Sequence, residues 1–254
     1  PTYFKDQFGV EGKVVLLTFG LLSPNKGIEQ VLNALPRIVE EFPGVVYVVL
    51  GATHPNELRE HGEAYRLSLE ILAKKRRVEK HVIFYNQFVD IENLKEFLGA
   101  ADLYVTPYLN ETQITSGTLA YAFGCGKAVV STPYWHAAEL LADGRGVLVP
   151  FADSEAMARE VIALLRDDTR RHAMRKNAYR VGRDMTWSSV AQQYMRSFES
   201  SRLQGAARSR KSLASKTLDQ KPRELPELKL SHLSRMTDST GVFQHAIFSA
   251  PNFS

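Results

Sequence analysis

The sequence predicts an α/β fold in which helices cover both faces of a parallel sheet. Strand-like and helix-like segments alternate from residue 13 to about residue 150. The strand-like segments are continuous apolar runs, which indicates strands that are buried on both faces of the sheet. Gly20 and Gly51 follow the first two runs, as expected where a strand ends in a turn.

Each strand in this pattern is followed by a helix. The strands are expected at residues 13–19, 45–50, 81–84, 102–106, 128–131 and 146–149. Helices between them are expected at about residues 28–39, 57–77, 91–98, 116–123 and 135–141, and further helices at 154–165, 169–181 and 187–202. In the first helix apolar residues recur at helical spacing. Pro36 lies inside it, so we expect a kink or a restart there.

The composition, with 44% hydrophobic and 24% charged residues, is ordinary for a soluble globular protein. Its longest apolar run, residues 45–50, is far shorter than the ~20 residues that a membrane-spanning helix needs. Cys125 is the single cysteine, which excludes an intrachain disulfide and a cysteine-rich metal site. The histidines form no metal-binding pattern, and a reducing cytoplasm is the expected location.

The net charge of +4 does not favour a nucleic-acid partner, because the basic excess lies in the C-terminal tail. Residues 202–254 contain 9 Lys and Arg against 4 Asp and Glu, whereas residues 1–201 contain 23 against 24. We therefore expect no nucleic-acid binding.

The composition changes after Arg202 and divides the chain into three parts. Residues 1–202 hold the alternating elements, and residues 203–229 are polar without apolar periodicity, which predicts a linker. Residues 230–254 become apolar again but are too few to bury a core. We expect the start of a truncated further domain there, or a disordered tail. Because the sequence begins at Pro1 and not at Met, we also expect it to be part of a longer protein.

Ligands of open parallel sheets bind beyond the carboxyl ends of the strands, so the loops there are the candidate site. The first loop, residues 20–27, lacks both the GxGxxG spacing and the P-loop spacing. It does offer the turn at Gly20 and the ammonium of Lys26 near a helix N-terminus, which together suit an anion. The alternative is a solvated loop lysine.

The loop after the fourth strand leads into a helix at Thr115, Ser116, Gly117 and Thr118. Backbone N–H groups at a helix start have no intrahelical partner and favour a phosphate. Ordinary capping by Thr115 or Ser116 is the alternative, and the two can coexist. Glu111 lies just ahead in the same loop.

The loop after the third strand contains Asn86, Gln87 and Phe88, whose amides and ring could hold a nucleotide base. Packing at the sheet edge is equally compatible with each of them. His136, beside Trp135 near the end of the fifth strand, is more typical of a packed or surface histidine than of a catalytic one.

In their order and spacing, these loops resemble the GT4-type retaining glycosyltransferases (glycosyl transferases group 1) over residues 13–200. Residues 20–27 resemble the family's G-R-L-x-x-x-K-G, and residues 101–108 followed by Glu111 resemble A-D-x-x-V-x-P-S followed by Glu. Residues 119–130 resemble E-A-x-A-x-G-x-P-V-V, and residues 138–149 resemble P-E-x-x-x-D-G-x-x-G-x-L-V. Thr186 and Trp187 resemble the (S/T)-W that opens the family's last helix.

The resemblance implies a GT-B fold, two Rossmann-like domains that face each other across a cleft. This chain would be the C-terminal, donor-binding half, and an acceptor-binding N-terminal domain would belong to the same full-length protein. Such an enzyme transfers a hexose from a nucleotide-diphosphate sugar to an acceptor hydroxyl with retention. The resemblance implies no cofactor and no metal.

The same resemblance assigns roles to residues of this sequence. Lys26 would neutralise the diphosphate, with Gly20 and the amides of residues 115–118 around it. Glu111 would lie at the transferred sugar, so that Glu111 and Lys26 are the expected catalytic residues. Asn86, Gln87 and Phe88 would hold the base.

Two positions depart from the family pattern. Leu21 replaces the arginine of the first loop, and Leu119 replaces the second glutamate, which would accept hydrogen bonds from the ribose. Polar groups of Gln113, Ser116 and Thr118 are the expected substitutes. The alternative is a non-catalytic module with a degenerate donor site. A nicotinamide-dependent oxidoreductase and a sugar-nucleotide epimerase are disfavoured by the missing glycine fingerprint.

Overall fold

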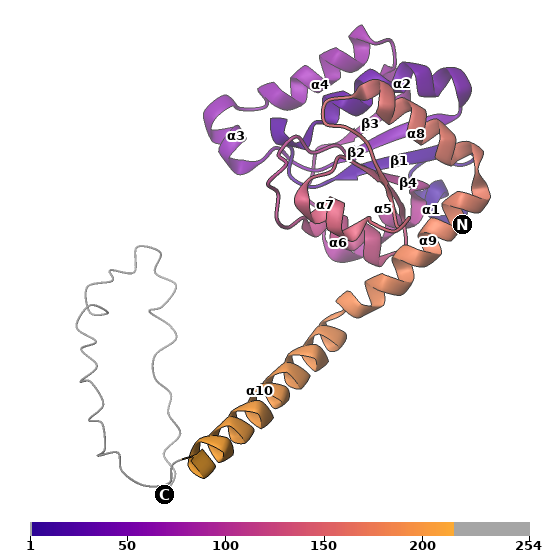
Figure 1. Cartoon of the computed structure of the whole chain (residues 1–254). Helices are drawn as coiled ribbons and strands as arrows, with labels where there is room; N and C mark the ends of the chain where they lie inside the picture. Colours follow the sequence, from indigo (N-terminus) through magenta and orange to yellow (C-terminus); the bar gives the residue numbers. More distant parts are fainter. Residues whose placement is uncertain (1, 216–254) are drawn as a thin grey trace, which may run out of the picture. The chain divides into compact units, whose positions relative to one another are not determined.

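The computed structural model describes residues 2–215 (Figure 1). The chain divides into two compact units, Pro1–Arg196 and Ser197–Ser254. The end of the predicted linker and the predicted start of a further domain, residues 216–254, lie outside the described residues. The three-part division of the chain therefore stays a prediction.

The described residues contain one parallel sheet of six strands in the order β3-β2-β1-β4-β5-β6. The strands are β1 (Val14–Phe19), β2 (Val45–Leu50), β3 (Val82–Tyr85), β4 (Leu103–Thr106), β5 (Ala128–Ser131) and β6 (Val147–Leu148). Every neighbouring pair is parallel, which confirms the predicted α/β fold. The chain first runs outward from β1 to β3 and then returns to the other side of β1, so the order reverses between β1 and β4.

Helices cover both faces of this sheet, and each face has its own apolar core (Figure 1). One face packs against α2 (Ile28–Glu41), α4 (Ala64–Lys75) and α8 (Ser154–Arg166). The other packs against α5 (Ile91–Ala100), α6 (Gly117–Gly124) and α7 (Trp135–Leu140). α9 (Asp168–Gly182) contributes Met174 to the first core and Ala178 to the second. The remaining helices are α1 (Thr2–Gln7), α3 (Pro55–His61) and α10 (Trp187–Ser215).

Three helices differ from the sequence prediction. The helix expected at residues 57–77 is split into α3 and α4, because Gly62 takes φ 60° and its N–H closes α3 on the carbonyl of Leu58. α2 does not restart at Pro36. A proline removes only one ladder hydrogen bond, and the buried apolar stripe of α2 continues on both sides of it. α10 continues to Ser215 instead of ending at Arg202, since residues 203–215 contain mostly helix-compatible residues and no proline.

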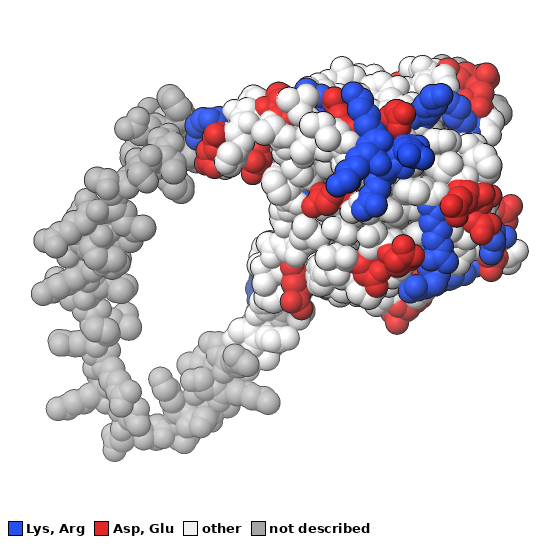
Figure 2. All heavy atoms as spheres, turned by 90° about the horizontal axis from the view of Figure 1, so that it is seen from above, with Lys and Arg blue, Asp and Glu red and all other residues white. Residues whose placement is uncertain are grey.

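Charged side chains of both signs lie side by side on the face of the molecule in Figure 2. This mixture agrees with the near balance of acidic and basic residues in residues 1–201. No helix within residues 2–215 is both long enough and apolar enough to span a bilayer.

Two glycines allow the first two strands to end close together. Gly51 has φ 152°, and a Cβ atom there would lie 1.9 Å from the carbonyl oxygen of Gly20. The N–H of Gly20 in turn donates to Leu50 O at 2.9 Å. Gly20 has φ 124°, and a Cβ on it would lie 3.0 Å from Cγ2 of Thr118 at the start of α6. Close backbone contact therefore joins the ends of β1 and β2, and Gly20 lies against the Thr118 side chain at the start of α6.

We expect Gly51→Ala to lower the free energy of unfolding by at least about 2 kcal/mol, because alanine would be strained at this φ and would clash with Gly20. Urea unfolding followed by circular dichroism measures the change. Gly44→Ala is the matched control, since a Cβ at Gly44 meets nothing within 4 Å, and its expected change is below about 0.5 kcal/mol. Equal stability of Gly51→Ala and the unsubstituted chain would contradict the close approach.

Candidate functional site

The loops after β1 and β4 are joined where the strand order reverses. The N–H of Leu109 donates to the carbonyl oxygen of Asn25 at 3.0 Å. Gly27 has φ 60°, and a Cβ there would lie only 2.1 Å from the carbonyl oxygen of Pro107. These contacts seat the Lys26 turn, residues Pro24–Lys26, directly on the loop that follows β4.

Lys26 reaches across this junction to Tyr108. Its Nζ donates to the Tyr108 hydroxyl at 2.8 Å and lies 4.0 Å from the centroid of the same ring. Tyr108 is only 2% exposed, and its ring stacks on that of Tyr134 at a centroid distance of 5.0 Å. The lysine is therefore held by a buried aromatic residue. The alternative from the sequence was a solvated loop lysine.

The hydrogen-bond chain continues to the N-terminus of α6. The hydroxyls of Tyr108 and Thr118 share a bond of 2.9 Å, and those of Thr118 and Ser116 share one of 3.1 Å. Ser116 caps the helix, because its Oγ accepts from the N–H of Leu119 at 3.3 Å. The structure thus brings Lys26 together with Ser116 and Thr118, and helix capping coexists with this arrangement as the sequence allowed.

The electrostatics of Tyr108 follow from these partners. Burial by itself raises the pKa of its hydroxyl. The charge of Lys26 and the hydrogen bonds with Lys26, Thr118 and Ser116 outweigh burial, so that the pKa lies below its ordinary value of 10.0. The neighbouring phenols of Tyr104 and Tyr134 have raised pKa values, chiefly because of burial. The positive charge of Lys26 therefore stabilises the ionised form of the Tyr108 hydroxyl.

The loop between β4 and α6 rests on the first turn of α7. The N–H of Ser116 donates to Nδ1 of His136 at 2.9 Å, and the N–H of Trp135 donates to Glu111 O at 3.0 Å. The backbone N–H of His136 donates to the carbonyl oxygen of Gln113 at 3.2 Å. His136 is half-buried, which fits the packed or surface histidine that the sequence favoured. Burial lowers its pKa, and the charge of Glu139 has a smaller, opposite effect. Glu111 and Thr115 are exposed on this loop.

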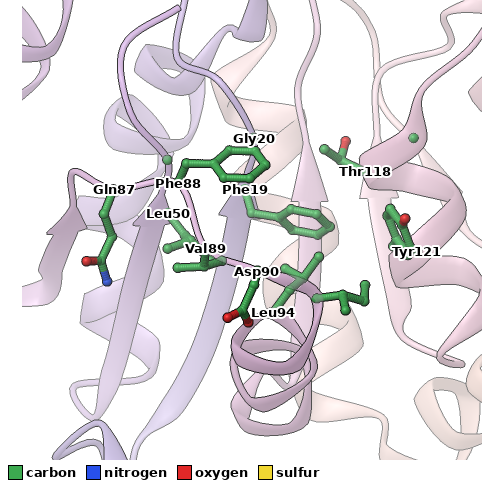
Figure 3. Close-up of a pocket in the computed structure, with 13 residues that line it drawn as sticks. Phe19, Gly20, Leu50, Gln87, Phe88, Val89, Asp90, Leu94, Thr118 and Tyr121 are labelled. Atoms are coloured by element: carbon green, nitrogen blue, oxygen red, sulfur yellow. The ribbon is translucent and has the colours of Figure 1, made fainter.

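A pocket of about 410 Å³ opens beside this cluster, at the carboxyl ends of β1 and β2. Figure 3 shows Gln87 and Phe88 on one side of it, Thr118 and Tyr121 on the other, and Phe19 between them. The pocket thus joins residues that the sequence analysis placed in two different roles. Its lining consists of Phe19, Gly20, Leu50, Gly51, Gln87, Phe88, Val89, Asp90, Ile91, Leu94, Gly117, Thr118 and Tyr121.

Other expected residues lie outside this lining. Asn86 lies near Glu63, whose pKa is lowered mainly by a hydrogen bond from Thr53 and also by Arg66 and Asn86. Lys26, Glu111, Thr115 and Ser116 do not line the pocket either. Lys26 and Ser116 are connected to its rim through Thr118.

The structure corrects the role of position 119. Leu119 is fully buried in the core on the face of the sheet that α5, α6 and α7 cover, so its side chain does not face the pocket. Tyr121, two residues further along α6, is 53% exposed and lines the pocket together with Gly117 and Thr118. A helix turns by 3.6 residues, so residues 117, 118 and 121 share one face while residue 119 faces the core.

Asp90 also lines the pocket and was not among the site residues predicted from the sequence. It begins α5, where its Oδ1 accepts from the N–H of Asn93 at 2.8 Å. Its capping pattern could have been read from the sequence, but its position in the pocket could not. Among the described residues, no group of three His, Cys, Asp or Glu side chains is placed to hold a metal ion.

Known proteins share this architecture. The chain is 31% identical to the phosphatidyl-myo-inositol mannosyltransferase of Mycolicibacterium smegmatis over 195 residues, which are 76% of this chain and 47% of that protein. The structure of HepE from Anabaena in complex with UDP and glucose matches 78% of this chain and 51% of its own chain, at 22% identity and a TM-score of 0.67. This chain spans about half the length of the curated relatives it matches.

One solved domain is matched over most of its length. The C-terminal domain of the glycosyl transferase group 1 family protein LpcC from Francisella tularensis matches 70% of this chain and 88% of its own, with a TM-score of 0.60 at 23% identity. At these identities the structural matches show the fold alone. The family model "Glycosyl transferases group 1" matches residues 1–181, and the chain therefore belongs to that family.

Proposed function

We propose that this chain is the donor-binding domain of a glycosyltransferase that moves a hexose, with retention, from a nucleotide-diphosphate sugar to an acceptor hydroxyl. The observation that carries the proposal is the continuous contact from the Lys26 ammonium through Tyr108 and Thr118 to the N-terminus of α6. It puts a cation and a positive helix end side by side. The names of the relatives, mannosyltransferases among them, support the class of reaction.

The diphosphate is bound at this junction. The Lys26 ammonium has three N–H donors, and the bond to Tyr108 leaves two for phosphate oxygens. The first backbone N–H groups of α6 supply further donors, and the helix dipole favours negative charge there. The hydroxyls of Ser116 and Thr118 add polar groups where Leu21 offers none. Gly20 lets the phosphates approach the backbone closely.

The nucleoside occupies the adjoining pocket. Phe19 and Phe88 offer apolar faces to a base, and Gln87 and Asp90 offer polar groups to its edge. Tyr121 takes the place on α6 from which a side chain reaches the ribose. Asn86 lies outside the lining of the pocket, at the start of the loop that carries Gln87 and Phe88.

The chemistry then follows from charge placement. The acceptor hydroxyl attacks C1 on the face that the nucleoside diphosphate leaves, through an oxocarbenium-like state, and its proton passes to the departing phosphate oxygen. Negative charge grows on the departing diphosphate, where Lys26 and the α6 N-terminus are already oriented to stabilise it. No metal is required in this scheme, because these groups supply the positive potential. Glu111, on the exposed loop ahead of α6, lies toward the transferred hexose.

The acceptor is bound by another part of the full-length protein. This chain corresponds to about half of its relatives, and we propose that an N-terminal acceptor-binding domain closes over the pocket. Closure would exclude water and complete the catalytic arrangement. The chain alone would bind nucleotide weakly and turn over slowly or not at all.

A non-catalytic module is the second candidate. Leu21 in place of an arginine favours it, and so does Tyr121, a phenol rather than a carboxylate on the pocket face of α6. The two candidates differ in the full-length protein, where Lys26→Ala and Glu111→Ala should abolish glycosyl transfer. Unchanged activity of both variants would favour the non-catalytic module.

We expect one of UDP, GDP or ADP to bind saturably, and Lys26→Ala to weaken that binding about 10- to 100-fold through loss of charge-assisted hydrogen bonds. Isothermal titration calorimetry of the 254-residue chain measures both affinities. Lys13→Ala, which removes a lysine at the opposite end of β1, is the matched control and should leave binding unchanged. No saturable binding of any of the three at millimolar concentration would contradict the proposal.

His136 makes the phosphate-binding loop sensitive to acid. Its neutral Nδ1 accepts the Ser116 N–H, and burial lowers its pKa below the ordinary value of 6.5. As the pH falls below 6.5, the unfolded chain takes up a proton that folded His136 resists. The free energy of unfolding should therefore fall in the window from 6.5 down to the lowered pKa.

The matching test compares the chain with His136→Asn, in which an amide oxygen can accept the same N–H without titrating. We expect the variant to lose less unfolding free energy than the unsubstituted chain when the pH falls below 6.5. Chemical denaturation across a pH series measures the difference. Identical pH dependence of the two proteins would show that His136 does not control this loop.

A further inference from the structure

We propose that Tyr108 is a positioning residue for the donor diphosphate: its hydroxyl and ring hold the Lys26 ammonium at the N-terminus of α6. The inference rests on the proposed function and deepens it. Tyr108 aligns with a serine in the family motif of the β4 loop, and Leu21 stands where the family has an arginine. One firmly held ammonium would thus neutralise the diphosphate, for which the family motif provides an arginine and a lysine.

Lys26 needs such a holder. A lysine ammonium sits on a flexible four-carbon stem, and ordering it when a ligand arrives costs affinity. The Tyr108 hydroxyl fixes Nζ at 2.8 Å, and the ring lies beneath it with its centroid at 4.0 Å. The cation is therefore ordered before any phosphate binds, and two of its donors remain available.

Tyr108 is itself held on several sides. It is 2% exposed, and its ring stacks on Tyr134 at an interplanar angle of 18°. Its carbonyl oxygen accepts from the Thr132 hydroxyl at 2.5 Å. The tight contact of Gly27 with Pro107 fixes the neighbouring backbone. A phenol packed in this way restricts the positions that Lys26 can take.

The hydroxyl matters more than the ring volume. A phenylalanine could fill the same space and stack on Tyr134, but it could not receive a hydrogen bond from Lys26 or share one with Thr118. The Thr118 hydroxyl bridges onward to Ser116, the N-cap of α6. The phenol oxygen thus joins the cation to the helix end.

The protonation state of Tyr108 offers an independent readout. The titratable and polar groups that face it are Lys26, Tyr104 and Tyr134, with the hydroxyls of Ser116 and Thr118. Lys26 lowers the pKa of Tyr108 against the opposing effect of burial. A bound diphosphate would add negative charge beside Lys26 and offset the effect of the ammonium, so the pKa of Tyr108 should rise on binding.

The experiment measures the affinity of the 254-residue chain for UDP, GDP and ADP by calorimetry. For each nucleotide that binds, Tyr108→Phe should raise the Kd about 10-fold. Tyr47→Phe is the matched control, because it removes a buried phenol hydroxyl that donates to Thr18 in the opposite core, and its Kd should not change. Thermal unfolding of both variants checks that they are folded.

Two further measurements separate positioning from packing. In the Lys26→Ala background, Tyr108→Phe should change the Kd by less than about 2-fold, since its effect passes through Lys26. In the unsubstituted chain, phenolate ultraviolet absorbance should show one tyrosine that titrates below the ordinary range, and nucleotide should move that titration upward. Tyr108→Phe should remove it.

The inference is overturned if the unsubstituted chain binds nucleotide and Tyr108→Phe binds it equally well. It is also overturned if Tyr108→Phe weakens binding as much without Lys26 as with it. If Tyr108→Phe does not fold, a tyrosine titration that nucleotide leaves in place in the unsubstituted chain overturns it instead. Failure of the unsubstituted chain to bind any nucleotide is a different result, which rejects the proposed function itself.

Discussion

The close junction of the loops after β1 and β4 is the constraint on which the candidate site depends. In an open parallel sheet these loops diverge where the strand order reverses, and a crevice forms between them. Here Gly27 of the first loop packs closely against Pro107 of the second loop. Lys26 can therefore reach across the crevice to Tyr108. A cation and a helix N-terminus, which belong to distant parts of the chain, are thereby brought together.

The sheet could be predicted because its signals are local. Continuous apolar runs separated by helical periodicity gave all six strands to within one residue at each end. The errors arose where one residue or the lack of a stop signal decides the outcome. Gly62 breaks a charged segment that would otherwise form one helix. α10 continues through a polar stretch that has helix propensity but no apolar stripe.

The loops that form the candidate site could be predicted from the sequence, but not which of their side chains face the pocket. The sequence located Lys26, Ser116 and Thr118, because glycines and helix starts mark anion-binding loops. It put the ribose-facing position of α6 at residue 119, whereas Leu119 is buried and Tyr121 lines the pocket. It also missed Tyr108, whose partner Lys26 lies 82 residues away in the sequence. Such a contact is visible only once the sheet is assembled.

The most direct test of the central claim is to map nucleotide binding by NMR on the isotopically labelled chain. Addition of the nucleotide that binds should shift the backbone amide signals of Gly20, Gly117 and Thr118 and the side-chain ammonium signal of Lys26. Signals near Lys13, at the opposite end of β1, should stay in place. Shifts confined to that opposite end, or saturation without any change at Lys26 and the start of α6, would contradict the account.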